Sequence, residues 1–420
     1  MRVTILAVGS RGDVQPAIGL GLGLRAAGFK VCIAAFGEFE MLIESYGFDY
    51  KLLRGDVRKL VESEAAQQML NSGNLYDLMQ FVKNGGYQEL VGFAQQDSWE
   101  AAQGSDVLIY HEAALWGYDI AEQLNIPAFR IGYQPVTPTR AFPAPSVGWA
   151  NLTAPINYLT HIAIGQFVWH SFRKQLNQFR RETLHLTNLA LRGSYAIQDA
   201  EPIPVLYGFS PSIIPKPNDW GEHIHVTGYW FAPAAAEWHP PSALLDFLDA
   251  GPPPVYVGFG SMGNPEAEAT TKIVVDGICK TGQRGVLAAG WGGLKQTDLP
   301  DNIFLIKSAP HTWLFPKMSV VVHHGGAGTS AAGLLAGVPT VVVPHFADQF
   351  FWGHQIHKLG IGPNIIPRKH LTPERLARDI KTCLNTPSMK TSAHQVAQRI
   401  RAEKGVDNAV HILQNYLQER

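Results

Sequence analysis

Residues 320–353 read VVVHHGGAGTSAAGLLAGVPTVVVPHFADQFFWG, and this stretch indicates the fold class. Two apolar runs, 320–322 and 340–343, each lead through a turn into a stretch with helical character. Strands that are apolar at every position are typical of a parallel sheet covered by helices on both faces. The stretch therefore predicts two consecutive strand–helix units of a doubly wound α/β domain.

The same alternation of strands and helices occurs twice along the chain. The strand candidates of the first series are residues 3–8, 30–36, 48–53, 106–110 and 126–133, and those of the second are 254–259, 285–290, 302–307, 319–324 and 340–345. We expect helices at 15–27, 156–191 and 406–420 and an irregular loop at 135–153. The pattern predicts two Rossmann-like domains, whose ligands bind beyond the carboxyl ends of the strands, in a cleft between the domains.

Proline indicates where the two domains meet. Five prolines occur between residues 201 and 217, a density that suits a linker. We expect a first, acceptor-binding domain at 1–205, a linker at 206–222, a second, donor-binding domain at 223–400 and a C-terminal helix at 401–420 that packs back on the first domain.

Composition narrows the class of protein. The chain has 420 residues, of which 46% are apolar, enough for a packed core in each domain. Its net charge of −1, without a basic stripe, argues against a nucleic-acid partner. The cysteines, Cys32, Cys279 and Cys383, lie far apart and suggest buried thiols in a reducing compartment. No apolar run reaches the length of a membrane span, so we expect a cytoplasmic protein that can still contact a membrane surface.

The glycine turn after residues 319–324 carries the strongest signal for chemistry. His324, Gly326, Gly328 and Thr329 stand where a strand passes into a helix. Glycines allow a ligand to approach the backbone, and the free N–H groups at a helix start favour an anion. These residues suit a pyrophosphate, with an imidazole beside it. The alternative is a tight strand–helix turn without a ligand.

Other polar residues follow neighbouring strands of the second domain. Asp348 and Gln349 follow residues 340–345 and suit sugar hydroxyls, although such a pair also occurs as a helix cap. The remaining candidates for donor contacts are Ser261 for a phosphate, Ser308 and His311 for a nucleobase edge, and Trp291, which either stacks on the base or packs in the core.

In the first domain, Asp13 lies in the loop GSRGDVQP, between the first strand and the first helix. A carboxylate there can take the proton of an acceptor hydroxyl as a general base, or it can simply cap the helix. We assign the neighbouring Ser10, Arg11 and Gly12 to donor contacts. The run GLGLGL, residues 19–24, lies inside the helix, and we interpret its glycines as helix-packing positions.

Acceptor contacts are expected from the first domain. His111 and Glu112 follow the strand 106–110 and either orient the base, bind the acceptor or form a surface pair. The candidate wall of an apolar pocket consists of Tyr133, Trp149, Phe167, Trp169 and Phe172. About half of these aromatic residues are expected to be core, and a membrane-docking surface is a further alternative.

Together these motifs resemble family 1 glycosyltransferases. The segments that carry the resemblance are GSRGDVQP, GFGS, PHTWLFP and residues 323–353, and GYDIAEQLNIPAFR and PVTPTRAFP are similar to the sterol 3-beta-glucosyltransferase branch in particular. The related antibiotic glycosyltransferases of bacteria share several of them. The resemblance spans nearly the whole chain.

The resemblance implies a GT-B fold, with the donor in the C-terminal domain and the acceptor in the N-terminal one, and inversion by direct displacement without a metal. It implies that Asp13 is the base, that His324 contacts the diphosphate, and that Asp348 and Gln349 hold the sugar. The sequence departs from the plant enzymes, which carry a catalytic His in the first loop and Trp at the positions of Ala327 and Ser308.

We therefore predict an inverting, metal-independent hexosyltransferase that moves glucose from a UDP-sugar to an apolar acceptor such as a sterol or another polycyclic lipid. It needs no cofactor besides this co-substrate, and we expect a monomer or a weak dimer. The alternatives are a glycosyltransferase for a polyketide, peptide or terpenoid that uses a UDP- or dTDP-sugar, and a non-catalytic protein that binds a nucleotide sugar or a lipid. An epimerase of the same fold and a nicotinamide oxidoreductase fit the residues less well.

Overall fold

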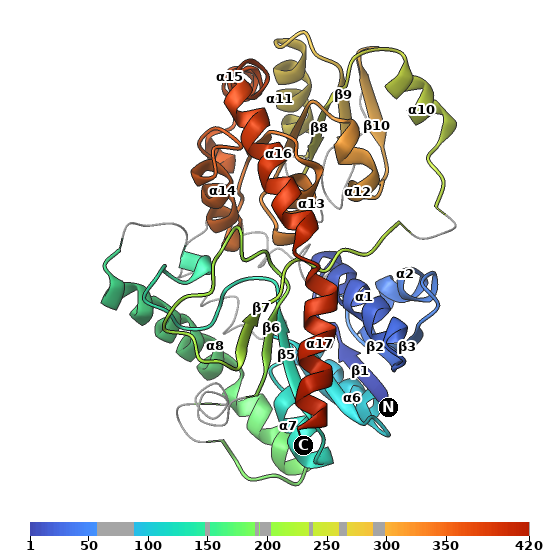
Figure 1. The fold of residues 1–420 in the computed structure, drawn as a ribbon, viewed down its shortest axis with the longest axis vertical. Coiled ribbons are helices and arrows are strands. Elements are labelled where there is room, and N and C mark those ends of the chain that lie inside the picture. The colour runs from blue at the N-terminus through green and yellow to red at the C-terminus, as the bar shows by residue number, and fades with distance from the viewer. Residues whose placement is uncertain are drawn as a thin grey trace. The chain divides into compact units, whose positions relative to one another are not determined.

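The chain forms two compact units (Figure 1). The computed structural model describes residues 1–56, 88–147, 152–189, 193, 203–234, 238–259, 267–288 and 299–419. In these ranges, the first unit comprises the chain up to Pro233 and again from Glu403 onward, and the second comprises Ala234–Ala402.

The first unit contains a sheet of seven parallel strands in the order β3-β2-β1-β4-β5-β6-β7. The strands are β1 Arg2–Leu6, β2 Lys30–Phe36, β3 Asp49–Leu53, β4 Val107–His111, β5 Ala128–Gly132, β6 Val205–Tyr207 and β7 Ile224–Val226. β1 pairs with both β2 and β4, so the order of the strands reverses there. Such a switch point is where doubly wound sheets bind their ligands.

The helices of the first unit are α1 Arg11–Ala26, η1 Gly37–Phe39, α2 Glu40–Glu44, α6 Gln88–Ala102, α7 Gly117–Leu124, η2 Pro145–Val147, α8 Ala154–Glu182 and α17 Gly405–Gln418. α1 begins four residues before the expected start because Ser10 caps it. The interpretation of its glycines is confirmed: a Cβ at Gly19 would lie 2.8 Å from the Trp230 carbonyl oxygen, and one at Gly23 would lie 2.2 Å from Val406.

The C-terminal helix α17 belongs to the first unit. It packs against α1, as Figure 1 shows in red and blue, and Tyr416 meets Phe129 of β5 edge-on with ring centroids 5.1 Å apart. Just before it, Glu403 accepts a hydrogen bond of 2.6 Å from the Ser210 hydroxyl. The chain therefore returns to the unit in which it began.

The structure differs from the expected boundary between the domains. The residues expected as a linker, 206–222, lie largely between β6 and β7 and belong to the first unit, which continues to Pro233. The indole of Trp220 stacks on Tyr207 with ring centroids 5.2 Å apart, and both side chains are buried. The prolines therefore shape a packed connection between two strands. The expected helix 156–191 likewise ends earlier, at Glu182.

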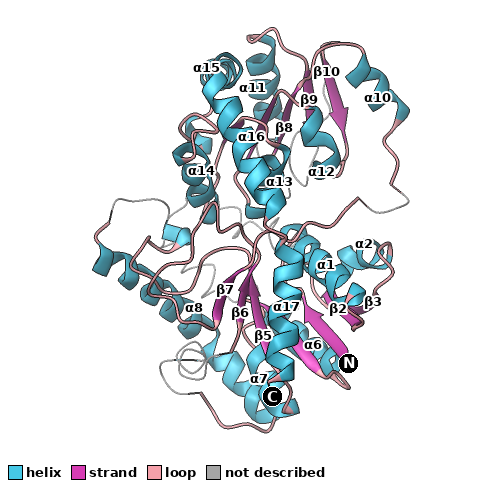
Figure 2. Ribbon diagram, viewed as in Figure 1, coloured by secondary structure: helices cyan, strands magenta, loops and turns pink. Residues whose placement is uncertain are grey.

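The second unit contains a sheet of five parallel strands in the order β10-β9-β8-β11-β12. Figure 2 labels three of these strands, β8, β9 and β10, in magenta. The strands are β8 Val255–Gly258, β9 Gly285–Ala288, β10 Ile303–Ile306, β11 Val320–His323 and β12 Thr340–Val342. The helices are α10 Ser242–Asp249, α11 Ala267–Cys279, α12 His311–Leu314, η3 Phe315–Lys317, α13 Ala327–Ala336, α14 Asp348–Lys358, η4 Arg368–His370, α15 Pro373–Asn385 and α16 Pro387–Ala402.

Core residues lie on both faces of the second sheet. Along β8, Val255 and Val257 belong to one buried cluster, whereas Tyr256 between them belongs to another. Neighbouring residues of a strand point to opposite faces, so helices must cover both. This confirms the parallel, doubly covered sheet that the continuous apolar runs predict.

Two expectations from composition concern cysteines and membrane spans. Cys32 and Cys383 are buried, but Cys279 is exposed at the end of α11, contrary to the expectation of three buried thiols. Across the described ranges, we find no helix whose length and apolar character would allow it to cross a bilayer.

Candidate active site

The switch point of the first sheet places Asp13 and His111 side by side. Val8, Gly9 and Ser10 follow β1, and His111 is the last residue of β4. Because β1 and β4 are parallel neighbours, their carboxyl ends lie at the same edge of the sheet. The two loops that the sequence analysis selected separately thus form one site.

Asp13 uses one carboxylate oxygen to hold the loop. Its Oδ2 accepts hydrogen bonds from the Ser10 backbone N–H at 2.6 Å and from the Ser10 hydroxyl at 3.0 Å, which completes a capping box. The Ser10 hydroxyl in turn accepts from Gly12 N–H at 3.2 Å. Gly9 has a φ of +142°, and a Cβ there would lie 2.3 Å from Oδ2. Asp13 therefore caps the helix, and its Oδ1 takes no part in that cap.

Oδ1 of Asp13 lies 3.5 Å from Nε2 of His111. The other ring nitrogen, Nδ1, lies 3.0 Å from the Val8 carbonyl oxygen. The Ala113 N–H also points at Nδ1, from 3.4 Å. A carbonyl oxygen can only accept, so we assign the hydrogen to Nδ1 on the shorter contact to Val8, and the neutral ring then presents the lone pair of Nε2 to Asp13. Burial lowers the pKa of His111, while Asp13 and the Val8 carbonyl oppose this effect. A neutral imidazole and a carboxylate therefore face each other.

Two further acceptor candidates adjoin His111. The ring of Tyr133 stacks on His111 with centroids 5.1 Å apart, and meets Trp230 edge-on at 5.9 Å. Burial, Asp13 and Glu112 together raise the pKa of Tyr133. Its buried hydroxyl has no hydrogen-bond partner among the described residues. Glu112 is half-buried. Its carboxylate packs against Gly132, where any side chain would come within 2.5 Å of Oε2 of Glu112.

The other aromatic candidates differ in burial. Trp169 is 1% exposed, and a Cβ at Gly193 would lie 2.5 Å from its ring, so it belongs to the core. Phe167 and Phe172 are half-buried on α8. Trp149 lies outside the described residues. The structure thus places Tyr133 beside Asp13 and His111, whereas Trp169 is a buried core residue of α8.

The second sheet has its switch point between β8 and β11, which pair with each other. The glycine turn predicted from sequence follows β11 at this point.

The other candidates for donor contacts lie in loops of both units. Arg11 and Gly12 of the first unit are exposed in the first turn of α1. Ser261, which follows β8, and Trp291, which follows β9, lie outside the described residues.

The two histidines of the turn have different roles. Nδ1 of His323 accepts a hydrogen bond of 2.9 Å from Gly325 N–H, and the ring is completely buried. Gly325 has a φ of +92°, and a Cβ there would lie 2.7 Å from the Gln349 carbonyl oxygen. His323 therefore shapes the turn, a role that the sequence analysis did not assign.

The ring of His324 lies over Gly326, where a Cβ would be 2.5 Å from its Nε2. Burial lowers the pKa of His324 to about 4, so the ring is neutral near pH 7. Its buried Nδ1 has no hydrogen-bond partner in the ranges that the structure describes. Gly326 is the N-cap of α13, and Gly328 and Thr329 lie in its first turn. The N–H groups of a helix start and a neutral imidazole can both donate to an anion.

The side-chain oxygen of Gln349 binds its own loop. Gln349 is 4% exposed, and its Oε1 accepts from the backbone N–H groups of His345 at 2.8 Å and of Phe346 at 3.3 Å. It thus fixes the loop after β12, in which Ala347 has a φ of +51°. Asp348, at the start of α14, is half-buried.

His345 in this loop is a further residue that the sequence analysis missed. Burial first, then the charges of His324 and Arg368, lower its pKa to about 3. Its Nε2 is buried without a hydrogen-bond partner among the described residues, and the ring lies 5.4 Å from that of Phe259 after β8. The available signal was its place directly after an apolar strand, which it shares with His324.

The candidates for the nucleobase follow β10. Ser308 is exposed. His311 begins α12, and its ring stacks on Phe315 with centroids 4.4 Å apart, while its Nε2 lies 3.4 Å from the Tyr256 hydroxyl. One face of the imidazole is therefore covered by the protein itself.

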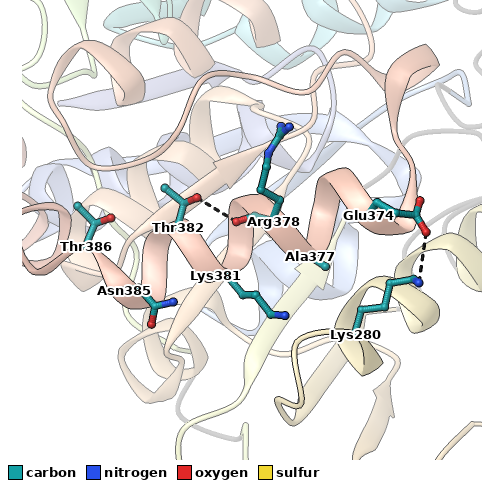
Figure 3. A pocket seen from close by; sticks show the side chains of 8 residues that line it. All are labelled: Lys280, Glu374, Ala377, Arg378, Lys381, Thr382, Asn385 and Thr386. Carbon is teal, nitrogen blue, oxygen red and sulfur yellow. Dashed lines mark hydrogen bonds and ion pairs between the residues drawn. The ribbon is translucent and has the colours of Figure 1, made fainter.

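A hollow at the other edge of the second sheet is not part of this site (Figure 3). It is lined mainly by α15, and Lys280 at its rim forms an ion pair of 3.3 Å with Glu374. Lys280 lies between the end of α11 and the start of β9, which is the edge where the strands begin. The motif residues gather where the strands end.

Comparisons with known proteins agree with the placement of these motifs. Residues 3–143 match the family model for the glycosyltransferase family 28 N-terminal domain. Residues 291–415 match the model for the erythromycin biosynthesis protein CIII-like C-terminal domain. The first model covers the Asp13–His111 pair, and the second covers the glycine turn.

The sterol 3-beta-glucosyltransferase UGT80B1 of Arabidopsis thaliana is 35% identical over 99% of this chain and 68% of its own length. The chain belongs to the sterol 3-beta-glucosyltransferase family. A sterol 3-beta-glucosyltransferase of Cryptococcus neoformans var. neoformans serotype D is 36% identical over 98% of this chain. The chain spans only 27% of that fungal relative.

The fold of this family member is GT-B, as in solved glycosyltransferase structures. The glycosyltransferase VinC in complex with DTDP aligns over the full length of both chains with a TM-score of 0.67 and 18% identity. At this identity the likeness establishes the fold and nothing finer.

Proposed function

We propose that the protein transfers glucose from UDP-glucose to the 3β-hydroxyl of a sterol, with inversion at the anomeric carbon. The observation that carries the proposal is the pair at the first switch point. Asp13 keeps one oxygen outside its capping box, and that oxygen faces His111 at 3.5 Å. The names of the relatives at 35–36% identity support the sterol and the glucose.

The reaction is a displacement at a single carbon. The acceptor oxygen forms a bond to the anomeric carbon while the bond from that carbon to the diphosphate oxygen breaks, and the electron pair leaves with the diphosphate. Asp13 Oδ1 takes the hydroxyl proton as general base. Attack opposite the leaving group inverts the configuration.

His111 acts on Asp13 as a positioning residue. Its Nε2 is an acceptor, because Nδ1 donates to the Val8 carbonyl. Before the reaction, the acceptor hydroxyl can donate to Oδ1, and Nε2 does not compete as a donor. Once Oδ1 is protonated, its O–H can donate to Nε2. The neutral imidazole therefore stabilises the protonated form of the base.

In the second unit, we assign the diphosphate to the turn after β11. The neutral ring of His324 and the N–H groups of Gly326, Gly328 and Thr329 would donate to the oxygens that gain charge as the bond breaks. In this scheme these donors stabilise the leaving group without a metal ion. Asp348 would bind sugar hydroxyls, while Gln349 holds the loop that presents it.

The test is a product analysis. The enzyme is incubated with UDP-glucose or dTDP-glucose and with a sterol, a flavonoid, a macrolide or a simple sugar. We expect sterol β-glucoside and equimolar UDP, and the anomeric proton coupling in the NMR spectrum reports inversion. Preference for dTDP-glucose and a macrolide would favour natural-product glycosylation instead, and binding of UDP-glucose without any transfer would favour a binding protein.

The compartment follows from the same proposal. The three cysteines are free in the structure, which suits a reducing compartment. We therefore place the reaction in the cytoplasm, where a sterol acceptor is available at a membrane surface.

A further inference from the structure

Exposed apolar side chains gather on the first half of α8. Of the ten large apolar residues that are most exposed in the described ranges, five lie between 147 and 162. Leu159 is 60% exposed, Ile156 45%, Ile162 38% and Tyr158 37%, and Val147 in η2 is 47% exposed. Such a gathering on one short segment marks an interaction surface, whereas single exposed apolar residues do not.

The second half of α8 continues this surface with basic residues. His170, Arg173, Lys174 and Arg181 line a hollow of about 430 Å³ together with Asn177, Gln178 and Asn188. The exposed residues 156, 159, 163, 170, 174 and 181 repeat at steps of three, four and seven, so they share one side of the helix. We call this side the α8 stripe; it is apolar at its start and basic at its end.

Acidic residues are almost absent from α8. Glu182, its last residue, is the only Asp or Glu between 154 and 182. The remaining arginine, Arg180, is buried in ion pairs with Asp119 and Glu122, so it does not belong to the stripe. At the apolar end, the Arg140 guanidinium lies 5.4 Å from the centre of the Tyr158 ring. The charged residues of the stripe itself are therefore all basic.

We propose that the α8 stripe docks the protein on an anionic lipid surface. The helix lies in the plane of the membrane, as Figure 1 allows with α8 at the edge of the first unit. Ile156 and Leu159 enter the interface between headgroups and acyl chains, and Lys174 and Arg181 bind lipid phosphates. This rests on the proposed function, because a sterol acceptor is dissolved in the bilayer.

The charge of the stripe selects a lipid surface over a second copy of the chain. A partner helix from a second copy would cover the apolar end but would bring its own basic residues, which repel or stay unpaired. An anionic bilayer offers apolar and negatively charged groups together. Each basic residue near such a surface strengthens binding about five-fold, and the effect weakens with salt.

The experiment measures sedimentation of the full chain with vesicles of phosphatidylcholine, with and without 30% phosphatidylserine. We expect binding to the anionic vesicles that falls at high salt. The double variants Ile156→Gln/Leu159→Gln and Lys174→Gln/Arg181→Gln should each bind at least ten-fold more weakly. The matched controls are Met41→Gln/Leu245→Gln, which are exposed elsewhere, and Lys390→Gln on α16; both should bind like the wild type.

Activity with two forms of the acceptor separates docking from catalysis. Transfer to sterol embedded in anionic vesicles should fall in the stripe variants by the same factor as binding, whereas transfer to sterol carried by cyclodextrin should not change. Wild-type binding by the stripe variants, or no binding of the wild type, would overturn the proposal. Light scattering that shows dimers of the wild type and monomers of the stripe variants would also overturn it, because the stripe would then bind a second copy of the chain. If no variant transfers glucose to any sterol, the proposed function fails, and the sedimentation result still decides docking.

Discussion

Oδ1 of Asp13 lies 3.5 Å from Nε2 of His111, while Oδ2 of the same carboxylate is held by Ser10. The two oxygens thus have separate tasks. One fixes the start of α1, and the other faces a neutral imidazole at the end of β4. A side chain that the sequence allows as either a cap or a base performs the first task in the structure and has the geometry for the second.

Replacement of Asp13 by Asn tests the base. We expect turnover to fall about 100- to 10,000-fold, because the amide cannot take the acceptor proton. The affinity for UDP, measured by calorimetry, should stay within a factor of two or so, since the donor residues are untouched. Asp407→Asn, in the first turn of α17, is the matched control for removing a charge at a helix start. Near-normal turnover of the Asp13 variant would exclude it as the base.

His111 should set the acidic limb of the pH profile. Burial lowers its pKa from 6.5, so it is neutral at higher pH and becomes protonated as the pH falls. The protonated ring would donate to Oδ1 and make Asp13 a weaker base, so kcat/KM should decrease on the acidic side. His111→Phe keeps a ring against Tyr133 and should remove this limb while lowering kcat about ten-fold. An unchanged profile would show that His111 only packs.

The donors at the glycine turn should act on the leaving group. His324→Ala should lower kcat by about 100-fold or more, because the lost hydrogen bond strengthens as charge develops. Binding of uridine, which lacks the diphosphate, should change little. Gly326→Ala should act in the same direction, since its Cβ would displace the His324 ring. Activity should persist in EDTA; loss that magnesium or manganese restores would contradict the metal-free scheme.

Asp348 and Gln349 should respond differently to alanine. Asp348→Ala should reduce the preference for UDP-glucose over UDP-galactose. The activation free energy that corresponds to kcat/KM for UDP-glucose should rise by about 1–3 kcal/mol. Gln349→Ala should instead lower the free energy of unfolding by a similar amount, about 1–3 kcal/mol, because it leaves two backbone N–H groups unpaired. Denaturant titration and donor competition separate the two effects. Equal effects of both changes would argue against separate roles.

Buried neutral histidines should make the second unit sensitive to acid. The pKa values of His324 and His345 are about 4 and about 3 in the folded chain, against about 6.5 when unfolded. Between these pKa values the unfolded chain binds more protons than the folded chain. The free energy of unfolding therefore has its full value above pH 6.5 and decreases as the pH is lowered. Each tenfold difference in proton affinity is worth about 1.4 kcal/mol. In the His345→Gln variant, Tm should decrease less than in the wild type as the pH is lowered below 6.5. A curve of Tm against pH that runs parallel to that of the wild type would contradict this.

Most regular elements could be predicted from the sequence because their signals are local. Every strand of the second sheet lies within a predicted apolar run, and the glycines of α1 contact neighbours as expected of packing positions. The boundary near residue 206 could not be predicted in this way. Prolines mark an interruption of regular structure, but the burial of Trp220 against Tyr207 decides that the segment belongs to the first unit.

The sequence by itself determined the two α/β series, the glycine turn and the residue types available for chemistry, because periodicity and turn residues act over a few positions. Only the tertiary structure decided which of these residues meet. The order of the strands brings Asp13 to His111, burial keeps His324 neutral, and a backbone contact commits Gln349 to the loop. These outcomes depend on contacts between residues distant in the chain and on the exclusion of water. Local sequence patterns predict neither of them.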